Sequence, residues 1–343
     1  MEKVTIYDIA KKTGFSVGTV SKALNNYKGV SEKARNAVQL ACAEMNFTPN
    51  STAQTLATKK SNLIGYVFSE TLGGGLLHPH FVQILQSFKT EVEASGYDLL
   101  LINSRTTVDH GFYEHCLHRQ IDGALIAIPR TEAGRVESLI NSSIPCVSIE
   151  DTYSEAPSVI SDNKGGTLQM LAHLYSLGHR KIAYIAAPQD GVPGWERYEA
   201  YLQFMTERGL PINENHIVFA TNYTRKAGYT AAEKLLGKCW EELPTAVFSA
   251  YDELSYAMQD TLERRGYRVP DEISVAGFDD ILISQCATPK LTTIAQNRDA
   301  IGKLAGQLLL RRMDGDTSVE NIIHRIPTSL VVRESTRRIL DQN

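Results

Sequence analysis

The stretch VTIYDIAKKTGFSVGTVSKALN, residues 4–25, decides how the N-terminal part of this chain folds. Thr5 and Asp8 form a T-x-x-D capping box, which predicts a helix that ends at Gly14. Ser16 suits the cap of a second helix, because VGTVSKAL has no proline and its apolar residues recur at helical spacing. Two short helices separated by a glycine-containing turn are typical of a helix-turn-helix.

A third helix is predicted after Ser31, whose hydroxyl suits a helix cap. Apolar residues recur along it every three or four positions and form one stripe that can face the other two helices. This stripe consists of Val30, Ala34, Val38, Ala41 and Met45. We therefore expect an all-α helix-turn-helix domain over residues 1–48. The polar segment 49–61 that follows can form a short helix, because residues 51–58 contain neither glycine nor proline.

GFSVG, residues 14–18, also fits the G-x-S-x-G pattern of α/β-hydrolases, in which the serine is the nucleophile. That chemistry requires a strand before the serine, because the strained turn from strand to helix exposes the hydroxyl. Here the preceding residues YDIAKKT predict a helix, and no sheet comes before them. A serine hydrolase using Ser16 therefore remains only the alternative hypothesis.

From residue 62 onward, short β-rich runs alternate with amphipathic helical runs. The predicted strands are 63–68, 97–103, 123–129, 145–150, 181–187, 216–220, 245–250 and 273–278, and the predicted helices are 81–95, 166–177, 195–208, 253–266 and 298–313. This alternation indicates βαβ units and parallel sheets buried on both faces. Because the series that starts at 63 is repeated from 181, we expect an α/β body of two doubly wound parallel-sheet lobes.

Charge is distributed unevenly along the chain. The net charge is −4, yet residues 1–60 hold nine Lys or Arg and only four Asp or Glu. A small basic domain on a larger acidic body is expected when only one of them touches phosphates. The sequence has no long apolar run and no apolar leader segment, so we expect a cytoplasmic protein. A sugar-binding protein without a DNA role, the other alternative, would need export.

No metal, cofactor or catalytic site is expected. His78 and His80, like His115 and His118, lack the further ligands of a zinc motif and are predicted to lie in a loop and on a helix surface. The glycine triplet at 73–75 lacks the Lys-Ser or Lys-Thr of a P-loop. The cysteines are widely spaced and odd in number, which indicates reduced thiols at Cys42, Cys116, Cys146, Cys239 and Cys286.

The second predicted helix has the composition of a DNA-recognition helix. Such a helix lies in the major groove, and its first turns carry short or flexible side chains that reach base edges and phosphates. One face of the helix has this character and consists of Val17, Gly18, Ser21, Lys22 and Asn25. The opposite face is apolar and can pack against the other two helices.

These segments resemble the lactose-repressor (LacI/GalR) family of bacterial transcription regulators. The resemblance spans nearly the whole chain and rests on the order of several motifs, namely residues 4–25, VSEKAR, NFTPN, AQTLA, LGHRKIAYI, RYEAY, VPDEISVAGFDD, PKLTTI and LVVRES. It implies a homodimer that binds a palindromic DNA operator. It also implies a periplasmic-binding-protein-like body that holds a small effector between two lobes and whose chain crosses between the lobes three times.

The resemblance also implies domain boundaries. Residues 1–48 would be the DNA-binding domain, 49–61 a hinge helix or linker, and 62–343 the domain that binds the effector and dimerises. Within that last domain the N-lobe would comprise about 62–160 and 292–324. The C-lobe would comprise about 161–291 and 325–340, including the LVVRES strand.

Carried over position by position, the resemblance assigns DNA contacts along the N-terminal part. Base contacts fall on Val17, Gly18 and Lys22. Contacts with or near phosphates fall on Thr5, Ser16, Thr19, Ser21 and Asn25. The hinge helix, whose leucine wedges into the minor groove, corresponds to Asn50, Ala53, Leu56 and Ala57. Lysine at position 22 replaces a common arginine and cannot form its bidentate fork with guanine, which shifts base preference.

The same comparison assigns effector contacts in the body. Arg197 and Asp279 match the positions that most often hold polar groups of the ligand. Neighbouring cleft positions are matched by Glu150, Asp162, Tyr251 and Gln296, and Trp195 lies two residues before Arg197. Carboxylates, an amide and an arginine beside aromatic faces suit the hydroxyls and ring face of a sugar. A sugar or sugar derivative is therefore expected, while a purine or a phosphorylated ligand stays open.

Overall fold

The computed structural model describes residues 4–25, 27, 29–48, 55, 58, 60–69, 76, 78–102, 111–188, 191–239, 242–319 and 322–339, with Arg130 and Thr131 described by backbone alone. The predicted hinge contacts Asn50, Ala53, Leu56 and Ala57 lie outside the described residues. The chain divides into two compact units, residues 1–63 and 64–343. We call them the head and the body, and each is described by itself.

Residues 4–48 of the head contain the three expected helices, α1 (Ile6–Thr13), α2 (Val17–Leu24) and α3 (Glu32–Glu44). Asp8 Oδ2 accepts hydrogen bonds from the backbone N–H of Thr5 at 2.9 Å and from its hydroxyl at 2.7 Å. Gly14 ends α1 with φ +74°, a left-handed conformation that favours glycine. Ser16 Oγ caps α2 by accepting from Thr19 N–H at 3.2 Å. The predicted caps are therefore confirmed.

A small apolar core holds the head together. Each helix contributes to it, and its fully or nearly buried members are Ile9, Ala10, Val20, Ala23, Val38 and Ala41. These residues lie at helical spacing on α1, α2 and α3. The core fixes α2 against its neighbours and leaves the opposite face of α2 on the surface.

The first lobe of the body, the N-lobe, is built on a six-stranded sheet in the order β2-β1-β3-β4-β5-β11. Its strands are β1 (Leu63–Phe68), β2 (Asp98–Ile102), β3 (Gly123–Ala127), β4 (Cys146–Ile149), β5 (Ser158–Ser161) and β11 (Ile323–Ile326). The pairs β1–β3, β3–β4, β4–β5 and β5–β11 are all parallel. Around the sheet lie α5 (Pro79–Glu93), α6 (Phe112–His118), η3 (Arg130–Arg135), α7 (Glu137–Ile140), α13 (Arg298–Met313) and η5 (Thr317–Val319).

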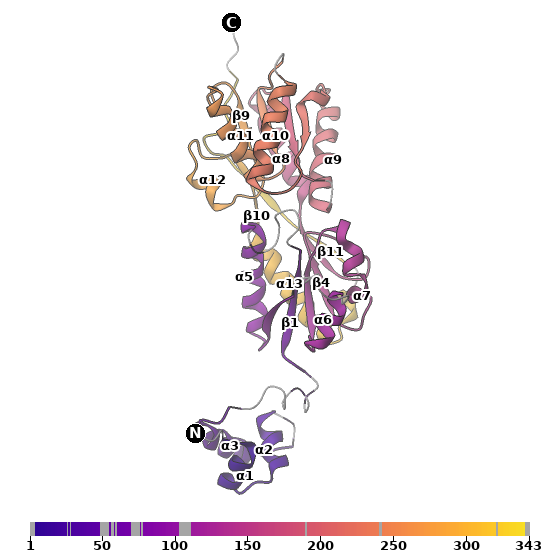
Figure 1. Cartoon of the computed structure of the whole chain (residues 1–343), viewed down its shortest axis with the longest axis vertical. Helices are drawn as coiled ribbons and strands as arrows, with labels where there is room; N and C mark the ends of the chain where they lie inside the picture. The colour runs from indigo at the N-terminus through magenta and orange to yellow at the C-terminus, as the bar shows by residue number, and fades with distance from the viewer. Residues whose placement is uncertain are drawn as a thin grey trace. The chain divides into compact units, whose positions relative to one another are not determined.

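The second lobe, the C-lobe, has a four-stranded parallel sheet in the order β7-β6-β8-β9. Its strands are β6 (Ile182–Ala186), β7 (Ile217–Phe219), β8 (Ala246–Ser249) and β9 (Ser274–Ala276), and its helices are α8 (Asn163–Ser176), α9 (Val192–Glu207), η4 (Glu214–His216), α10 (Arg225–Lys238), α11 (Asp252–Arg264) and α12 (Leu282–Cys286). In both lobes the second, first, third and fourth strands along the chain lie side by side in that order. The two doubly wound lobes predicted from the repeat are confirmed (Figure 1).

An antiparallel pair of strands, β10 (Thr293–Gln296) and β12 (Thr328–Val331), lies where the chain passes between the lobes. The chain passes from one lobe to the other after β5, again at β10, and again between β11 and β12. Ser335 Oγ then donates to Val275 O at 2.6 Å, which places the LVVRES segment beside β9 in the C-lobe. β11 extends to Ile326, two residues beyond the N-lobe limit of 324 that the sequence suggested.

Two helices of the N-lobe, α5 and α13, pack unusually closely (Figure 1). A Cβ atom added to Gly302 on α13 would lie 2.3 Å from the carbonyl oxygen of Ile84 on α5. One added to Gly306 would lie 2.9 Å from Cβ of Glu91. The two glycines therefore bring the helix backbones together and fix α13, which begins two residues after Gln296, a residue of the cavity described below.

Two further features concern membrane-spanning helices and the state of the cysteines. None of the helices in the described part of the chain is long and apolar enough to cross a membrane. All five cysteines are free thiols, as predicted. Cys116, Cys146 and Cys239 are buried, and burial raises the pKa of each of these thiols.

Candidate functional site

The exposed face of α2 is the first candidate site. Gly18 and Lys22 are exposed on it, while Ser21 and Asn25 are half-buried. Val17 is also half-buried and packs against the head core, so part of this predicted base-contacting side chain is occupied within the head. A glycine and a flexible lysine one turn apart leave this face narrow and positively charged, which suits an approach to the edges of DNA bases.

The start of α2 and the start of α1 are polar. The hydroxyl groups of Ser16 and Thr19 lie 2.9 Å apart, and Ser16 is exposed. Thr5 is exposed at the start of α1. Helix N-termini carry a partial positive charge and N–H groups that bind phosphate oxygens. The two helix starts thus have the chemistry that the predicted phosphate contacts require.

The second candidate site is a cavity in the body that contains about 660 Å³ of empty space, its mouth included. Residues that follow β1, β3 and β4 of the N-lobe and β6 and β8 of the C-lobe line it, so it opens at the carboxyl ends of both parallel sheets. This is where open α/β sheets bind ligands. The polar and aromatic lining includes Ser69, His78, His80, Phe81, Glu150, Arg197, Tyr223, Tyr251 and Gln296.

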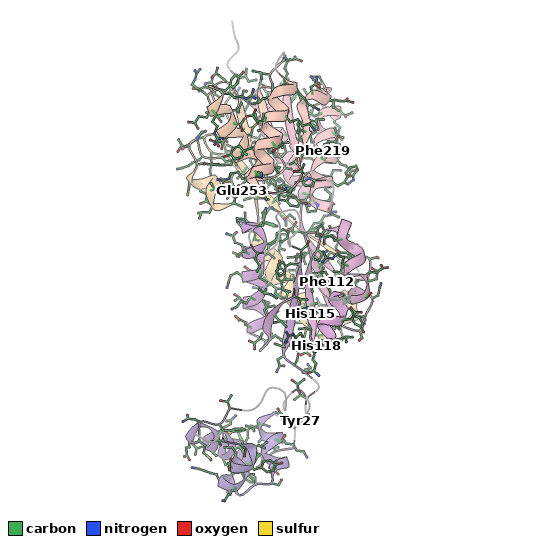
Figure 2. The ribbon with its side chains drawn as sticks, viewed as in Figure 1. Tyr27, Phe112, His115, His118, Phe219 and Glu253 are labelled. Atoms are coloured by element: carbon green, nitrogen blue, oxygen red, sulfur yellow. The ribbon has the colours of Figure 1, made fainter. Side chains whose placement is uncertain are left out.

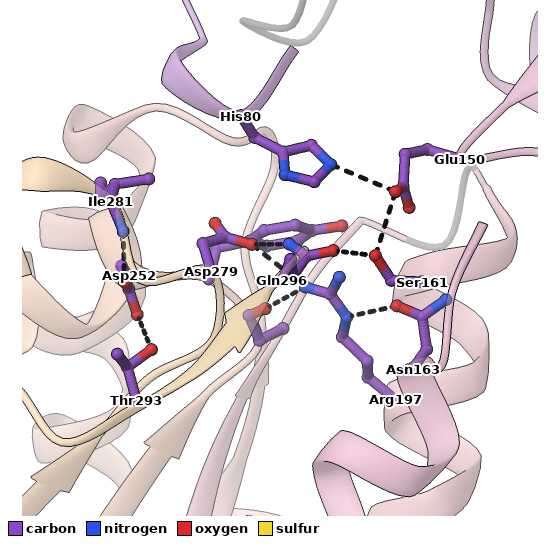
Figure 3. Close-up of polar contacts among 12 residues, drawn as sticks. His80, Glu150, Ser161, Asn163, Arg197, Asp252, Asp279, Ile281, Thr293 and Gln296 are labelled. Carbon is purple, nitrogen blue, oxygen red and sulfur yellow. Dashed lines mark hydrogen bonds and ion pairs between the residues drawn. The ribbon is translucent and has the colours of Figure 1, made fainter. Parts of the chain in front are cut away.

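Arg197 is the most deeply buried charge of the cavity, with 1% of its surface exposed. Its Nε donates to Asn163 Oδ1 at 2.9 Å, and its Nη1 donates to the carbonyl oxygen of Ala250 at 2.7 Å (Figure 3). The guanidinium carbon lies 3.6 Å from the ring centre of Phe278 and 4.7 Å from that of Tyr251. Hydrogen bonds and cation–π contacts therefore hold the guanidinium in one orientation.

Asp279 lies beside Arg197, with 3.7 Å between Asp279 Oδ1 and Arg197 Nη1. Gln296 donates its amide N–H to the same carboxyl oxygen. Burial raises the pKa of Asp279 well above its ordinary value, against the opposing charge of Arg197. The backbone of Asp279 has φ +135°, a conformation that is strained for a side-chain-bearing residue and is often found at functional sites.

A second acid, Glu150, lies at the opposite side of the cavity and is bonded to His80. His80 Nε2 donates to Glu150 Oε1 over 3.3 Å, and both side chains are nearly buried. Burial lowers the pKa of His80 and keeps the imidazole neutral. Burial by itself would raise the pKa of Glu150, but hydrogen bonds from His80 and Ser161 and the charge of Arg197 lower it. Glu150 is therefore an ionised acceptor.

A line of hydrogen bonds joins the two acids. The hydroxyl of Ser161, at the end of β5, lies 3.1 Å from Glu150 Oε1 and also contacts the amide oxygen of Gln296. Gln296 in turn donates to Asp279 (Figure 3). Ser161 and Gln296 belong to segments where the chain passes between the lobes, so the line connects one side of the cavity with the other.

Aromatic rings form a third side of the cavity. The ring of His78 makes edge contacts with Phe81, Tyr223 and Tyr251 at centroid distances of 5.7, 6.4 and 6.4 Å. Tyr223 and Tyr251 lie 5.0 Å apart at 82°. Burial lowers the pKa of His78 to about 3, so this ring is uncharged at neutral pH. The rings offer an apolar surface on which the face of a ring-shaped ligand can lie.

Several polar atoms of this cavity are buried and have no hydrogen-bond partner among the residues that the structure describes. They are His78 Nδ1, His80 Nδ1 and Glu150 Oε2. Leaving a buried acceptor unpaired costs about 1–3 kcal/mol, and more for a charged group. Clustered unpaired atoms in a cavity at the ends of two sheets are the arrangement expected where a ligand supplies the missing partners.

Comparison with known proteins covers both the head and the body. Residues 5–50 match the model of bacterial regulatory proteins, lacI family, and residues 171–336 match a periplasmic binding protein-like domain. The HTH-type transcriptional regulator DegA of Bacillus subtilis is 30% identical over 342 residues, which cover 97% of this chain and 98% of DegA. The chain belongs to the lacI family.

Two solved structures of transcription regulators resemble this chain over nearly its whole length. The lac repressor dimer bound to operator and the anti-inducer ONPF has a TM-score of 0.83 and 28% identity, covering 98% of this chain and 100% of that one. The complex of the transcriptional regulator CelR with cellobiose has a TM-score of 0.73 and 27% identity, covering 97% and 100%. This chain is therefore a DNA-binding transcription regulator with a lacI-family body.

An enzymatic function is excluded by the same findings, since the relatives are transcriptional regulators. The structure explains why GFSVG does not mark a hydrolase. Ser16 follows α1 and starts α2, and the described part of the head contains helices and turns but no strand. Ser16 is a helix cap in a lacI-family head, and the strained elbow that activates a serine is absent there.

The predicted effector residues of this lacI-family body fall into two groups. Glu150, Arg197, Tyr251 and Gln296 line the cavity, and Asp279 contacts two of them. Asp162 and Trp195 are not part of the lining. Asp162 instead caps α8 by accepting from Gly165 N–H at 2.9 Å. Trp195 is 46% exposed and contacts Tyr198. Two residues correspond to about 200° around a helix, so Trp195 points away when Arg197 points inward.

The predicted location of two histidines was wrong. His78 and His80 were expected in a loop or on a helix surface, but both are buried in the cavity at the start of α5. His118 does lie exposed on α6, where Figure 2 also shows His115. Among the residues that the structure describes, no group of three or more His, Cys, Asp or Glu side chains could hold a metal ion.

The cavity is also connected to an ion pair between the lobes. Asn163, which accepts from Arg197, donates through Nδ2 to Glu196 Oε2 at 3.1 Å. Arg325 on β11 of the N-lobe binds both carboxylate oxygens of Glu196 on α9 of the C-lobe, at 2.9 and 2.6 Å. Sequence reasoning missed Asn163, Glu196 and Arg325, because their roles depend on how the two lobes meet.

Proposed function

We propose that this lacI-family chain is a repressor that binds a palindromic operator as a homodimer and changes its affinity for DNA when a sugar or sugar derivative fills the cavity. The basic head and the exposed face of α2 support the DNA part. The structure of the lac repressor dimer bound to operator, which matches 98% of this chain, supports the dimeric part. No membrane partner is expected, and the cytoplasm is the proposed location.

The observation that carries the effector part is the group of buried, unpaired polar atoms beside aromatic rings. His78 Nδ1, His80 Nδ1 and Glu150 Oε2 need hydrogen-bond partners that the described residues do not supply. A sugar offers hydroxyl groups to such atoms and a ring face to Tyr223 and Tyr251. The cellobiose complex of CelR is a related case in which a lacI-family body holds a disaccharide.

The DNA contacts of the proposal follow the sequence assignments. Val17, Gly18 and Lys22 are proposed to face bases, and the helix starts at Thr5 and Ser16 to face phosphates. In the segment 49–61 the leucine at 56 is proposed to wedge between base pairs in the minor groove. Closing or opening of the two lobes would set whether both heads of the dimer can hold their half-sites at once.

The first experiment identifies the operator. Purified full-length protein is used to select DNA from a library of random palindromes, and affinity for the enriched sequence is measured by fluorescence anisotropy. We expect a symmetric site bound by two chains, with log affinity falling steeply and linearly with log salt concentration. Enrichment of asymmetric sequences bound by one chain would contradict the dimeric repressor.

The second experiment identifies the effector and tests coupling. Mono- and disaccharides and their phosphates are screened by thermal shift, and each hit is titrated with and without operator. If the effector loosens operator binding tenfold, about 1.4 kcal/mol, then operator must loosen effector binding tenfold. Identical effector affinity in the two titrations would refute the coupling while leaving DNA binding intact.

A further inference from the structure

The two lobes place functional side chains on corresponding elements. In the N-lobe, α5 follows the first strand, β1, and has a proline, Pro79, in its first turn. In the C-lobe, α9 follows the first strand, β6, and has Pro193 in its first turn. His80 lies at the start of α5, and Arg197 lies in the first part of α9. Both side chains are buried in the cavity.

The partners of these two residues also lie on corresponding segments. Glu150 directly follows the fourth strand of the N-lobe, β4, and Asp279 closely follows the fourth strand of the C-lobe, β9. Both acids have a positive φ, +57° and +135°. Each contacts the nitrogen-bearing side chain of its own lobe, Glu150 with His80 at 3.3 Å and Asp279 with Arg197 at 3.7 Å. His80–Glu150 is therefore the N-lobe counterpart of Arg197–Asp279.

The two pairs differ in whether their buried polar atoms have hydrogen-bond partners. Arg197 donates to Asn163 and Ala250, and Asp279 accepts from Gln296. In the N-lobe pair, His80 Nδ1 and Glu150 Oε2 are buried and have no hydrogen-bond partner in the described part of the chain. The N–H of His80 is on Nε2, because a carboxylate oxygen can only accept. The neutral imidazole thus leaves Nδ1 as a second acceptor beside the acceptor Oε2.

We propose that His80 and Glu150 form a second ligand-binding pole of the cavity, which takes two hydroxyl donors of a neutral sugar and rejects a phosphate or carboxylate at that end. This inference rests on the proposed effector function and narrows the class of effector. A hydroxyl group donates one hydrogen bond to each acceptor. A phosphate or carboxylate oxygen brings no donor at neutral pH and places a second negative charge beside Glu150, which low-dielectric surroundings make unfavourable.

The state of the imidazole is consistent with this assignment. Burial lowers the pKa of His80, and the nearby charges of Arg298 and Arg197 act in the same direction, while Glu150 opposes them. His78, the adjacent ring in the cavity, is neutral for the same main reason. The pole therefore presents acceptors to a ligand at neutral pH rather than a positive charge that would attract anions.

The test uses full-length protein and the neutral sugar that gives the largest thermal shift, together with the 6-phosphate and the 6-carboxylate of the same skeleton. Binding is measured by calorimetry without DNA. In Glu150→Gln, the amide oxygen still accepts from Ser161 and His80, and an NH₂ replaces the free Oε2. We expect this variant to bind the neutral sugar about tenfold more weakly or worse, and to bind the 6-carboxylate better than the wild type does.

Two variants at position 80 separate the nitrogen atoms. The amide group of His80→Gln lies where Nε2 lies, so it keeps the donor to Glu150 and removes the Nδ1 acceptor. The amide oxygen of His80→Asn lies where Nδ1 lies and keeps the acceptor. We expect His80→Gln to lose about tenfold in affinity for the neutral sugar or more, and His80→Asn to lose less. His118→Gln, on the surface of α6, is the matched control and should bind as the wild type does.

The outcomes distinguish this inference from the proposed function. Wild-type affinity in both Glu150→Gln and His80→Gln would overturn the second pole, even if the sugar still releases the operator. Tighter binding of the 6-phosphate or 6-carboxylate than of the neutral sugar by wild type would overturn it as well. If the neutral sugar binds and the variants weaken it, but operator affinity does not respond, the pole stands and the proposed regulation fails. Ligand-free melting temperatures show whether each variant is folded.

Discussion

Acidification should destabilise the body through His78, whose ring lies among the aromatic residues of the cavity. Burial lowers its folded-state pKa to about 3, whereas an unfolded histidine titrates near the ordinary value of 6.5. Between these two values the unfolded chain binds the proton and the folded chain does not. The free energy of unfolding therefore falls as pH decreases from about 6.5 toward 3, and the loss is absent above that range.

The magnitude follows from the two pKa values. At about pH 5 the unfolded imidazole has been titrated through roughly 1.5 pH units, while the folded imidazole is still neutral. Each unit corresponds to about 1.36 kcal/mol, so His78 alone lowers the free energy of unfolding by about 2 kcal/mol between about pH 7.5 and pH 5. Other groups titrate too. Asp279 acts in the opposite direction, because its raised pKa lets the folded chain take up a proton first.

A matched variant isolates the contribution of His78. His78→Phe keeps an aromatic ring against Phe81, Tyr223 and Tyr251 but cannot bind a proton. Urea unfolding of both proteins is followed by tryptophan fluorescence at about pH 7.5 and pH 5. Both tryptophans, at positions 195 and 240, belong to the body, so the signal reports on that unit alone.

The expected result is a difference between the two proteins in how much stability each loses on acidification. On acidification the wild type should lose about 2 kcal/mol more stability than His78→Phe, since every other titrating group is shared. A difference below about 0.5 kcal/mol would refute the reasoning, because it would mean that His78 is protonated in the folded body as easily as in the unfolded chain. If that is the outcome, addition of the effector should not alter the ionisation of His78 either.

Further predictions concern the head and the packing of the N-lobe. Ser16→Ala removes the acceptor for Thr19 N–H and should lower head stability and operator affinity by about 1 kcal/mol each, measured by circular dichroism and anisotropy; unchanged operator affinity would contradict a DNA-facing helix start. Leu56→Ala should weaken specific operator binding by a few kcal/mol and leave effector titrations unchanged; equal loss on random DNA would contradict the wedge. Gly302→Ala should lower the stability of the body by about 1–3 kcal/mol in thermal unfolding, because the added Cβ meets α5. The control Gly237→Ala, whose added Cβ meets nothing within 4 Å, should not be destabilised. Similar melting temperatures of the two variants would count against close packing of α5 and α13.

The parts of the fold that could be predicted from sequence are those set by local residues. The capping box of Thr5 and Asp8 and the cap at Ser16 depend on atoms within one helical turn, and these predictions are confirmed. The strands β5, β10 and β11 have four residues each and mixed polarity. They are strands because distant segments pair with them, so period-two patterning within four residues gives too weak a signal.

Prediction from local sequence is limited in the same way for the single side chains of the cavity. Arg197 and Asp279 could be assigned because motifs around them match a family. His78 and His80 could not, because their burial depends on the C-lobe residues Tyr223 and Tyr251 meeting the start of α5. A usable signal was nevertheless present. A proline-started helix follows the first strand of each lobe, and the buried nitrogen-bearing side chain of each lobe lies in that helix.

The matching positions of His80–Glu150 and Arg197–Asp279 bear on how such a body changes during evolution. In the proposed arrangement, each lobe supplies one half of the ligand contacts from its own strands and helices. A substitution in one half alters how one end of the ligand is recognised and leaves the other half in place. New effectors can therefore be acquired one end at a time, with a partly recognised molecule as the intermediate, while the strands that carry the two halves keep their order.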